Sequence, residues 1–262
     1  RGTLTLDGAT VRLASTGSST YLRGNTSVSG STLNIAGNGS IDFAGADNAN
    51  NDITAWHAAS TLNIGSGISL TGTQSGGIFM GTAGAFSGTA TAATTGKTLS
   101  FGGRNWNNAG TLRAAGGTLS VTSDNATTWA SSGTLDLDSG ILTLGGTFNT
   151  DSFNTLARDG VAAGSLRITG ALNNANATLT LDDSTGAVLL SGSITGGTIR
   201  ANNPAGGALL MNGVGYLIDT TLAAVDGVAG SGLYVIDNGT SMEARGTLTL
   251  DGATVRLAST GS

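Results

Sequence analysis

The residues best suited to chemistry in this 262-residue chain are two aspartates that stand two positions apart, Asp136 and Asp138. They alternate with Leu135 and Leu137, so on an extended strand both carboxylates point to one face, about 6.5–7 Å apart. Carboxylates at that spacing could serve as the acid and base of a polysaccharide-cleaving enzyme or as ligands of a calcium ion. The same alternation also describes an ordinary solvated strand face, so we retain the pair as ligand-binding candidates only.

Three tryptophans, Trp56, Trp106 and Trp129, are the other ligand-binding candidates. Their flat apolar rings could form a platform on which sugar rings stack. Tryptophan also packs under loops and at the ends of cores, where its ring is buried and its N–H finds a partner. The sequence leaves both interpretations open.

The Asn/Asp-rich loop from Gly45 to Asp52 could hold a calcium ion, although Asn/Asp turn chemistry explains it equally well. Nothing else in the chain has the composition of a catalytic or metal centre. His57 is the only histidine and there is no cysteine, so a nucleophile would depend on a single residue for its activating base. No group of His, Cys and carboxylate residues has metal-ligand spacing. We therefore expect no catalytic residue, no metal and no cofactor, and we expect that the chain is not an enzyme.

Short strands must position these side chains. A phrase of Gly or Ser, then Thr, then Leu or Ile recurs along the chain, for example at 2–4, 31–33, 60–62 and 133–135. Apolar and polar residues alternate after it until Gly, Asn, Asp or Ser ends the run, which predicts short strands with one buried face. The expected inward residues are Leu4, Leu6, Leu33, Ile35, Leu135, Leu137, Leu142, Leu144, Leu179 and Leu181, and the expected outward ones are Thr3, Thr5, Thr134 and Asp136.

Composition narrows the class of protein. The chain has 44 glycines, one proline and only 10% charged residues, against about 25% charged residues in an average globular domain. Disordered chains are rich in charge and proline, so disorder is disfavoured. A net charge of −5 with scattered arginines argues against binding to nucleic acid or anionic lipid. No apolar run approaches 18 residues, so we expect no membrane insertion by this segment.

These features together predict an all-β fold, a right-handed parallel β-solenoid of short strands with Gly or Asn corners. Each strand supplies only two or three apolar residues, and like residues would stack on successive coils about 4.7–4.9 Å apart. The alternative is an array of antiparallel β-sandwich repeats, since a segment such as 4–13 also has the pattern of a hairpin.

The Gly-Thr-Leu-x-Leu phrases, the Gly/Ser/Thr/Asn richness and the absence of cysteine resemble bacterial cell-surface β-helix proteins. The resemblance is to autotransporter passenger regions and filamentous-haemagglutinin-like adhesins. Residues 246–257, GTLTLDGATVRL, resemble the autotransporter-associated β-strand repeat. The resemblance implies an extracellular location on a bacterial cell surface and an adhesive or scaffold function. It assigns no catalytic residue.

The most specific signal is a long-range repeat. Residues 1–18 and residues 245–262 both read RGTLTLDGATVRLASTGS, an offset of 244 residues. We therefore interpret 1–244 as one period of a tandem solenoid repeat and 245–262 as the start of the next identical copy. Copies would join without a seam if 244 residues made a whole number of coils, which at about 20–25 residues per coil predicts about 10–12 coils and an axial repeat of about 50–60 Å.

The functional expectation is a structural repeat segment of a long extracellular fibre, stalk or adhesin. Its stiffness would come from continuous backbone ladders, and its partners would be further copies of the same repeat, end to end, together with glycans or proteins of a host or neighbouring cell. The alternatives are a carbohydrate-active β-helix enzyme and a glycan-binding module.

Overall fold

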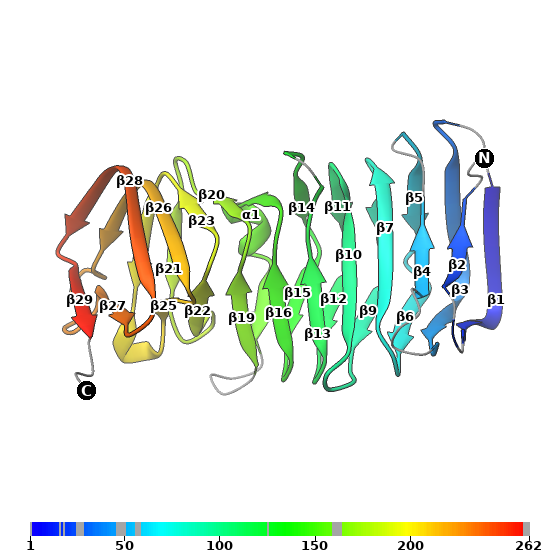
Figure 1. Cartoon of the computed structure of the whole chain (residues 1–262), viewed down its shortest axis with the longest axis horizontal. Helices are drawn as coiled ribbons and strands as arrows, with labels where there is room; N and C mark the ends of the chain where they lie inside the picture. The colour runs from blue at the N-terminus through cyan, green and yellow to red at the C-terminus, as the bar shows by residue number, and fades with distance from the viewer. Residues whose placement is uncertain are drawn as a thin grey trace.

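A computed structural model of the chain describes residues 2–15, 17, 19–24, 29–45, 51–55, 59–124, 126–158 and 164–258. The chain forms a β-solenoid of about 9 turns, in which short strands stack side by side along one axis (Figure 1). Almost every described pairing is parallel, and the antiparallel pairings of Thr61 with Gly81 and of Ala223 with Gly252 are single residue pairs. The predicted solenoid is confirmed, and the antiparallel sandwich array is not the fold.

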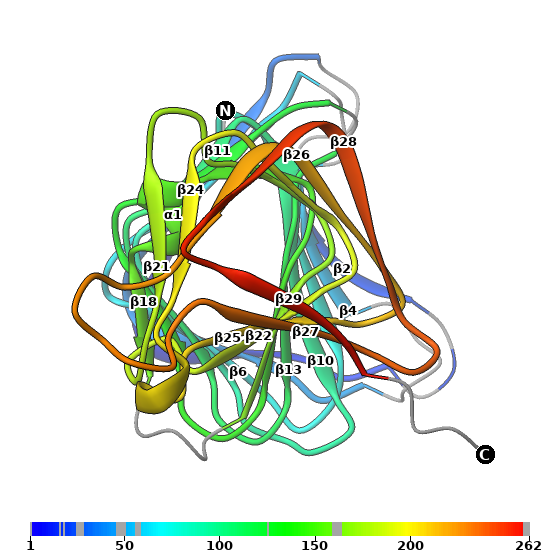
Figure 2. The same cartoon turned by 90° about the vertical axis from the view of Figure 1, so that its left-hand side faces the viewer.

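Each coil has three faces, so the stack has a triangular outline when it is viewed along its axis (Figure 2). The first face carries β5 (Thr61–Ile64), β8 (Ala85–Phe86), β11 (Trp106–Asn108), β14 (Trp129–Ser131), β17 (Thr147–Asn149), β20 (Ala171–Asn173) and β23 (Ser193–Thr195). The second carries β6 (Ile68–Gly72), β9 (Thr89–Ala92), β12 (Thr111–Ala114), β15 (Thr134–Leu137), β18 (Leu156–Arg158), β21 (Thr178–Leu181) and β24 (Thr198–Ala201).

Four long strands run across both the first and the second face. They are β1 (Gly2–Leu13), β3 (Thr32–Phe43), β26 (Val214–Ala223) and β28 (Ser241–Asp251). The third face carries β2 (Thr20–Arg23), β4 (Asn51–Thr54), β7 (Gly76–Thr82), β10 (Thr98–Arg104), β13 (Thr118–Val121), β16 (Ile141–Leu144), β19 (Ser165–Ile168), β22 (Ala187–Leu190), β25 (Ala208–Met211), β27 (Leu233–Asp237) and β29 (Thr254–Ala258). The third-face strands form one unbroken parallel ladder from β2 to β29.

Helical structure in the described chain is limited to two single turns. The turn α1 (Thr150–Phe153) follows β17, and the side chain of Asn149 caps it by accepting a hydrogen bond from the Ser152 N–H. A 3₁₀ turn covers Asn203–Ala205. No described helix is long and apolar enough to cross a membrane.

Like residues stack on like residues, as the repeated phrase predicts. Leu33 pairs with Leu62 inside, and Asn34 pairs with Asn63 outside. The Asn63 Nδ2 donates a hydrogen bond to the Asn34 Oδ1 at 3.0 Å. Stacked amide side chains hydrogen-bond to one another along the solenoid axis. Polar side chains therefore stabilise the outer surface, as the leucines stabilise the core.

The predicted inward residues form the core. Leu135, Leu137, Leu142, Leu144, Leu179 and Leu181 are all fully buried, and Leu6, Leu33 and Ile35 are buried as well. Leu4 is only partly buried, because β1 has a neighbouring coil on one side only. Thr3 and Thr5 are exposed, whereas Thr134 and Asp136 are half-buried because coils flank them on both sides.

Coil length varies more than the sequence predicts. Thr98 pairs with Thr118, twenty residues later, whereas Gly2 pairs with Leu33, thirty-one residues later. From β2 to β29 the third-face ladder contains ten successive coil-to-coil pairings. The segment 4–13 is not a hairpin, because β1 continues through a bulge between Asp7 and Ala9 with Gly8 at φ 67°.

The two copies of the repeated segment occupy different faces. In the first copy, residues 2–7 lie on the first face and residues 9–13 on the second, both paired with β3. In the second copy, residues 248–250 pair with the second-face part of β26, and residues 254–258 pair with β27 on the third face. The expectation of a whole number of coils per 244 residues is therefore wrong, because each residue of the second copy lies one face further round the coil than its equivalent in the first copy.

Glycines stack at the corner that precedes the second face. The Cβ that an alanine would add at Gly133 would overlap the carbonyl oxygen of Gly110, and one added at Gly110 would overlap that of Gly88. The Gly110 oxygen also accepts the hydrogen bond from the Thr134 N–H at 2.8 Å. The abundance of glycine thus reflects close approach of successive coils as well as turn geometry.

Gly133→Ala is expected to destabilise the fold by about 1–3 kcal/mol, because two backbones held in register must separate to admit a methyl group. Urea unfolding followed by circular dichroism would measure the change. Gly2→Ala is the matched control, since its added Cβ meets nothing within 4 Å, and it should change stability by less than about 0.5 kcal/mol. Equal effects at the two positions would contradict the close-approach explanation.

Candidate functional site

Asp136 and Asp138 lie on the outer surface of the second face with an arginine between them. Arg113 on the preceding coil occupies the register position of Asp136. Its Nε lies 3.3 Å from the Asp136 Oδ2, and its Nη2 lies 2.9 Å from the Asp138 Oδ2. One guanidinium thus neutralises both carboxylates. Arg113 is a basic partner that the sequence did not reveal, and the arrangement is that of an inter-coil ion-pair cluster that joins β12 to β15.

Trp106 and Trp129 lie inside the solenoid, each 1% exposed. They belong to a column of rings in which Trp106 stacks on Trp129 with centroids 6.1 Å apart, and Trp129 stacks on Phe148 at 4.9 Å. Each indole Nε1 donates to a backbone oxygen at 2.8 Å, Thr122 for Trp106 and Gly145 for Trp129. Buried rings cannot present a platform to sugars, so these two residues are core. Trp56 lies outside the described residues.

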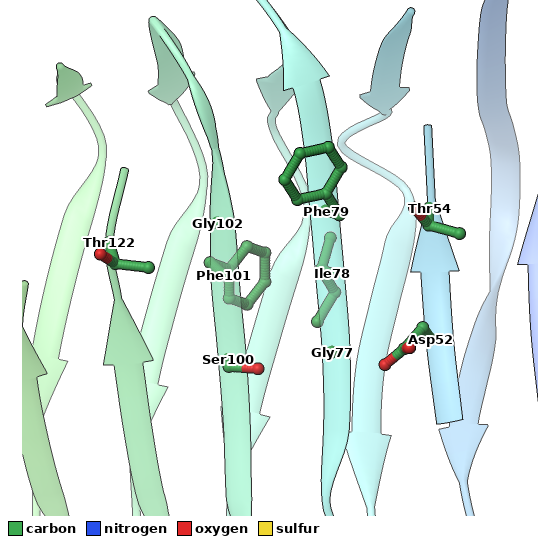
Figure 3. A pocket seen from close by; sticks show the side chains of 9 residues that line it. All are labelled: Asp52, Thr54, Gly77, Ile78, Phe79, Ser100, Phe101, Gly102 and Thr122. Carbon is green, nitrogen blue, oxygen red and sulfur yellow. The ribbon is translucent and has the colours of Figure 1, made fainter. Parts of the chain in front are cut away.

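A hollow of about 380 Å³ opens on the outer surface of the third face (Figure 3). Strands β4, β7 and β10 form it, together with the residue that follows β13. Its lining residues are Asp52, Thr54, Gly77, Ile78, Phe79, Ser100, Phe101, Gly102 and Thr122. The hollow brings an aromatic ring and a carboxylate together in one concavity, so it is the candidate functional site.

Two glycines create this hollow. In the strand register Asp52, Gly77 and Ser100 form one outward row, and Thr54, Phe79 and Gly102 form the next. A Cβ at Gly77 would lie 2.5 Å from the Asp52 Oδ1, so the absent side chain makes room for the carboxylate. A Cβ at Gly102 would meet only the Thr122 Cγ2, at 3.6 Å. The surface beside the Phe79 ring is therefore open, and an alanine at 102 could narrow it without strain.

The hollow places a half-buried phenyl ring beside acceptor and donor groups. Phe79 points outward from β7, while Ile78 and Phe101 form the apolar floor below it (Figure 3). Burial raises the pKa of the Asp52 carboxyl above its ordinary value of 3.8, and the nearby positive charge of Arg23 partly offsets that rise. The Ser100 hydroxyl donates to the Gly76 oxygen at 3.3 Å. An apolar ring flanked by a carboxylate and hydroxyls suits a ligand with one apolar face and polar edges.

The raised pKa of Asp52 has a consequence for stability. The folded state holds the Asp52 proton more tightly than the unfolded chain, so the charged form costs stability at pH values above the folded-state pKa. This cost disappears as the pH falls below the ordinary value of 3.8, where both states are protonated. Asp52→Asn is expected to raise the urea midpoint at pH 7, and the difference from the wild type should vanish near pH 3. A lower midpoint at pH 7 would show that attraction by Arg23 outweighs burial.

Part of this site could have been predicted from sequence patterns. Phe79 was not among the candidates taken from the sequence, but Ile78 and Met80 alternate with it in the run 76–81, so the period of two is the signal that could have placed the phenyl ring outside. Asp52 ends the Asn/Asp-rich run 47–52, whose composition is typical of a turn, whereas the structure places it in β4. The pairing of Asp52 with Gly77 depends on a coil of irregular length, which no local signal reveals.

No protein-family model, curated protein or solved structure matches this chain. Within the described ranges, no group of three or more His, Cys, Asp or Glu side chains could hold a metal ion. The assignment of function therefore rests on the geometry of this chain alone.

Proposed function

We propose that the chain is a structural repeat segment of a long extracellular fibre, stalk or adhesin on a bacterial cell surface. The observation that carries this proposal is the unbroken parallel ladder from β2 to β29 on the third face. Continuous ladders with a continuous apolar core resist bending, and each coil needs only its neighbours for stability. The absence of disulfides is consistent with stabilisation by stacking alone.

The repeated segment supports the same proposal. Eighteen identical residues recur after 244 positions, and in both copies the chain turns a corner at the equivalent glycine, Gly8 at φ 67° and Gly252 at φ 65°. The second copy thus forms the same bend while lying on the opposite end of the stack. Tandem copies could continue the solenoid through this segment.

Electron microscopy of the native material would test the fibre proposal. The ten coil-to-coil steps of the third-face ladder, at about 4.8 Å each, predict a thin rod whose axial repeat is roughly 50 Å per copy. Compact particles without axial periodicity would contradict it, as would a parent gene that encodes a single copy.

A second candidate function is glycan binding at the third-face hollow, in keeping with an adhesive role. The combination of Phe79, Asp52 and flanking hydroxyls favours it, because a sugar ring offers an apolar face and hydroxyl edges. The Arg113 ion pairs give no support to a catalytic role for Asp136 and Asp138, so we do not propose a carbohydrate-active enzyme.

A glycan array probed with the wild type, Phe79→Ala and Gly102→Ala would test this second function. Both variants should lose any hit that the hollow produces, the first by removing the ring and the second by filling the space beside it. Thr143→Ala, an outward position of β16 that does not line the hollow, is the control and should bind like the wild type. Hits that survive both hollow variants would place the binding elsewhere.

A further inference from the structure

Two rows of outward side chains run along the solenoid axis on the third face, from β4 to β19. The parallel registers of six strands define them. The first row consists of Asp52, Gly77, Ser100, Ser120, Thr143 and Arg167. The second consists of Thr54, Phe79, Gly102, Thr122, Gly145 and Thr169. Both rows lie within the stack, because β2 pairs with β4 on one side and β22 pairs with β19 on the other.

The first row begins with a negative charge and ends with a positive one. Five strand-to-strand steps, or about 24 Å, separate Asp52 from Arg167. Arg167 forms no ion pair in the described part of the chain, and its Nε is buried without a hydrogen-bond partner. Asp52 forms no ion pair among the described residues either, since the guanidinium of nearby Arg23 lies over the Tyr21 ring, 3.5 Å from its centroid. The face therefore presents two opposite charges that this chain does not pair.

The second row combines a projecting ring with open positions. The Phe79 ring stands out from β7, and Gly102 beside it has no side chain (Figure 3). A Cβ at Gly145 would lie 3.1 Å from the Thr122 Oγ1 and 3.4 Å from the Thr169 Oγ1, so this glycine leaves a gap between two threonines. The midpoint between Phe79 and Gly145 falls between β10 and β13, as does the midpoint between the two charges. A projection and a gap thus share one centre with an acid and a base.

We propose that the third face binds the third face of a second copy of this chain, through a twofold axis that runs along the strands between β10 and β13. This rotation reverses the solenoid axis and leaves each row opposite itself, so every contact occurs twice. All three glycines of the rows then lie opposite a side chain, and both charges meet their opposites. The facing positions are Asp52 and Arg167, Gly77 and Thr143, Ser100 and Ser120, Thr54 and Thr169, Phe79 and Gly145, and Gly102 and Thr122.

The charges select this arrangement over the other symmetric one. A twofold axis parallel to the solenoid axis would also bring the two faces together, but it would place Asp52 beside Asp52 and Arg167 beside Arg167 of the other copy. The perpendicular axis gives two ion pairs in place of two repulsions. The same rotation sets Tyr21 opposite Leu189, because these residues occupy the next outward positions of the first row. An aromatic ring thus meets an aliphatic side chain at each end of the interface.

The size and direction of the interface suit pairing between fibres. From β2 to β22 the face is about 38 Å long and about 15 Å wide, so the pair buries roughly 1,100 Å² in total. One such contact is at the lower end of specific interfaces, and repetition along a fibre would strengthen it. The two solenoid axes run in opposite directions, as they do in fibres that project from facing cells. The inference rests on the proposed fibre and names its partner as the same chain on an opposing fibre.

Sedimentation velocity over a range of concentrations tests the charge pairing. Asp52→Lys and Arg167→Glu should each weaken self-association at least about tenfold, because like charges then meet twice. An equimolar mixture of the two variants should form heterodimers, and the double variant should self-associate like the wild type. Asp151→Lys, at an exposed carboxylate of α1, is the control and should also associate like the wild type. A monomeric wild type, or a double variant that does not recover, would overturn the proposal.

A substitution remote from the charges separates pairing from folding and from glycan binding. Gly145→Thr fills the gap that receives Phe79, continues the column of Thr122 and Thr169, and leaves the lining of the hollow unchanged. Self-association should be lost, while the circular dichroism spectrum and any glycan hit of the hollow stay as in the wild type. Association that survives this substitution would refute the pairing. A periodic fibre built from a chain that does not pair would reject this inference and retain the structural role.

Discussion

Replacing Trp129 with alanine is expected to lower the free energy of unfolding by about 3–5 kcal/mol. The indole is 1% exposed and lies between the rings of Trp106 and Phe148. Collapse around the cavity is hindered, because hydrogen bonds in register fix β14 to the neighbouring coil. The substitution also removes the donor to the Gly145 carbonyl oxygen, which lies 2.8 Å from the Nε1. Urea unfolding followed by far-ultraviolet circular dichroism would measure the loss.

Two further variants separate the contributions. Trp129→Phe keeps a ring in the column but leaves the Gly145 oxygen without its partner, which should cost about 1–3 kcal/mol. Tyr216→Ala removes an outward ring whose main contact is the guanidinium of Arg245, 4.0 Å from the centroid, and should cost about 1 kcal/mol. A Trp129→Ala protein as stable as the Tyr216→Ala protein would mean that the column does not hold the coils together.

The core was largely predictable from sequence because its rule is local. Alternation in the segments around Leu135 and Leu179 fixes which side chains point inward, whatever coil they stack on. The same rule placed Asp136 outside, where it lies. Such assignments need only the period of a strand, so a single sequence suffices for them.

Contacts between coils were not predictable in the same way. Arg113 meets Asp136 only because 23 residues separate the paired positions Thr111 and Thr134 at that point of the stack, whereas other coils differ in length by several residues. The aromatic column and the third-face hollow depend on the same irregular spacing. The sequence also failed to predict that the second copy of the repeated segment lies one face further round the coil than the first. That shift is the sum of the lengths of many unequal coils.

The repeated segment supplies its own matched pair of substitutions. Leu13→Ala is expected to weaken the docking of β1 by about 2–5 kcal/mol, because the side chain is 4% exposed and belongs to the core beside Phe43. Leu257→Ala alters the same residue in the same sequence context, yet its side chain is 78% exposed. In the monomer it should change stability by less than about 0.5 kcal/mol.

Hydrogen exchange is the sharper measurement for this pair, since β1 is paired on one side only and should open before the rest of the stack. Leu13→Ala should speed the exchange of amides that join β1 to β3, while amides of β13 and β16 keep their protection. Leu257→Ala should leave both groups unchanged. Equal sensitivity of the two leucines in the monomer would mean that another part of the chain covers Leu257.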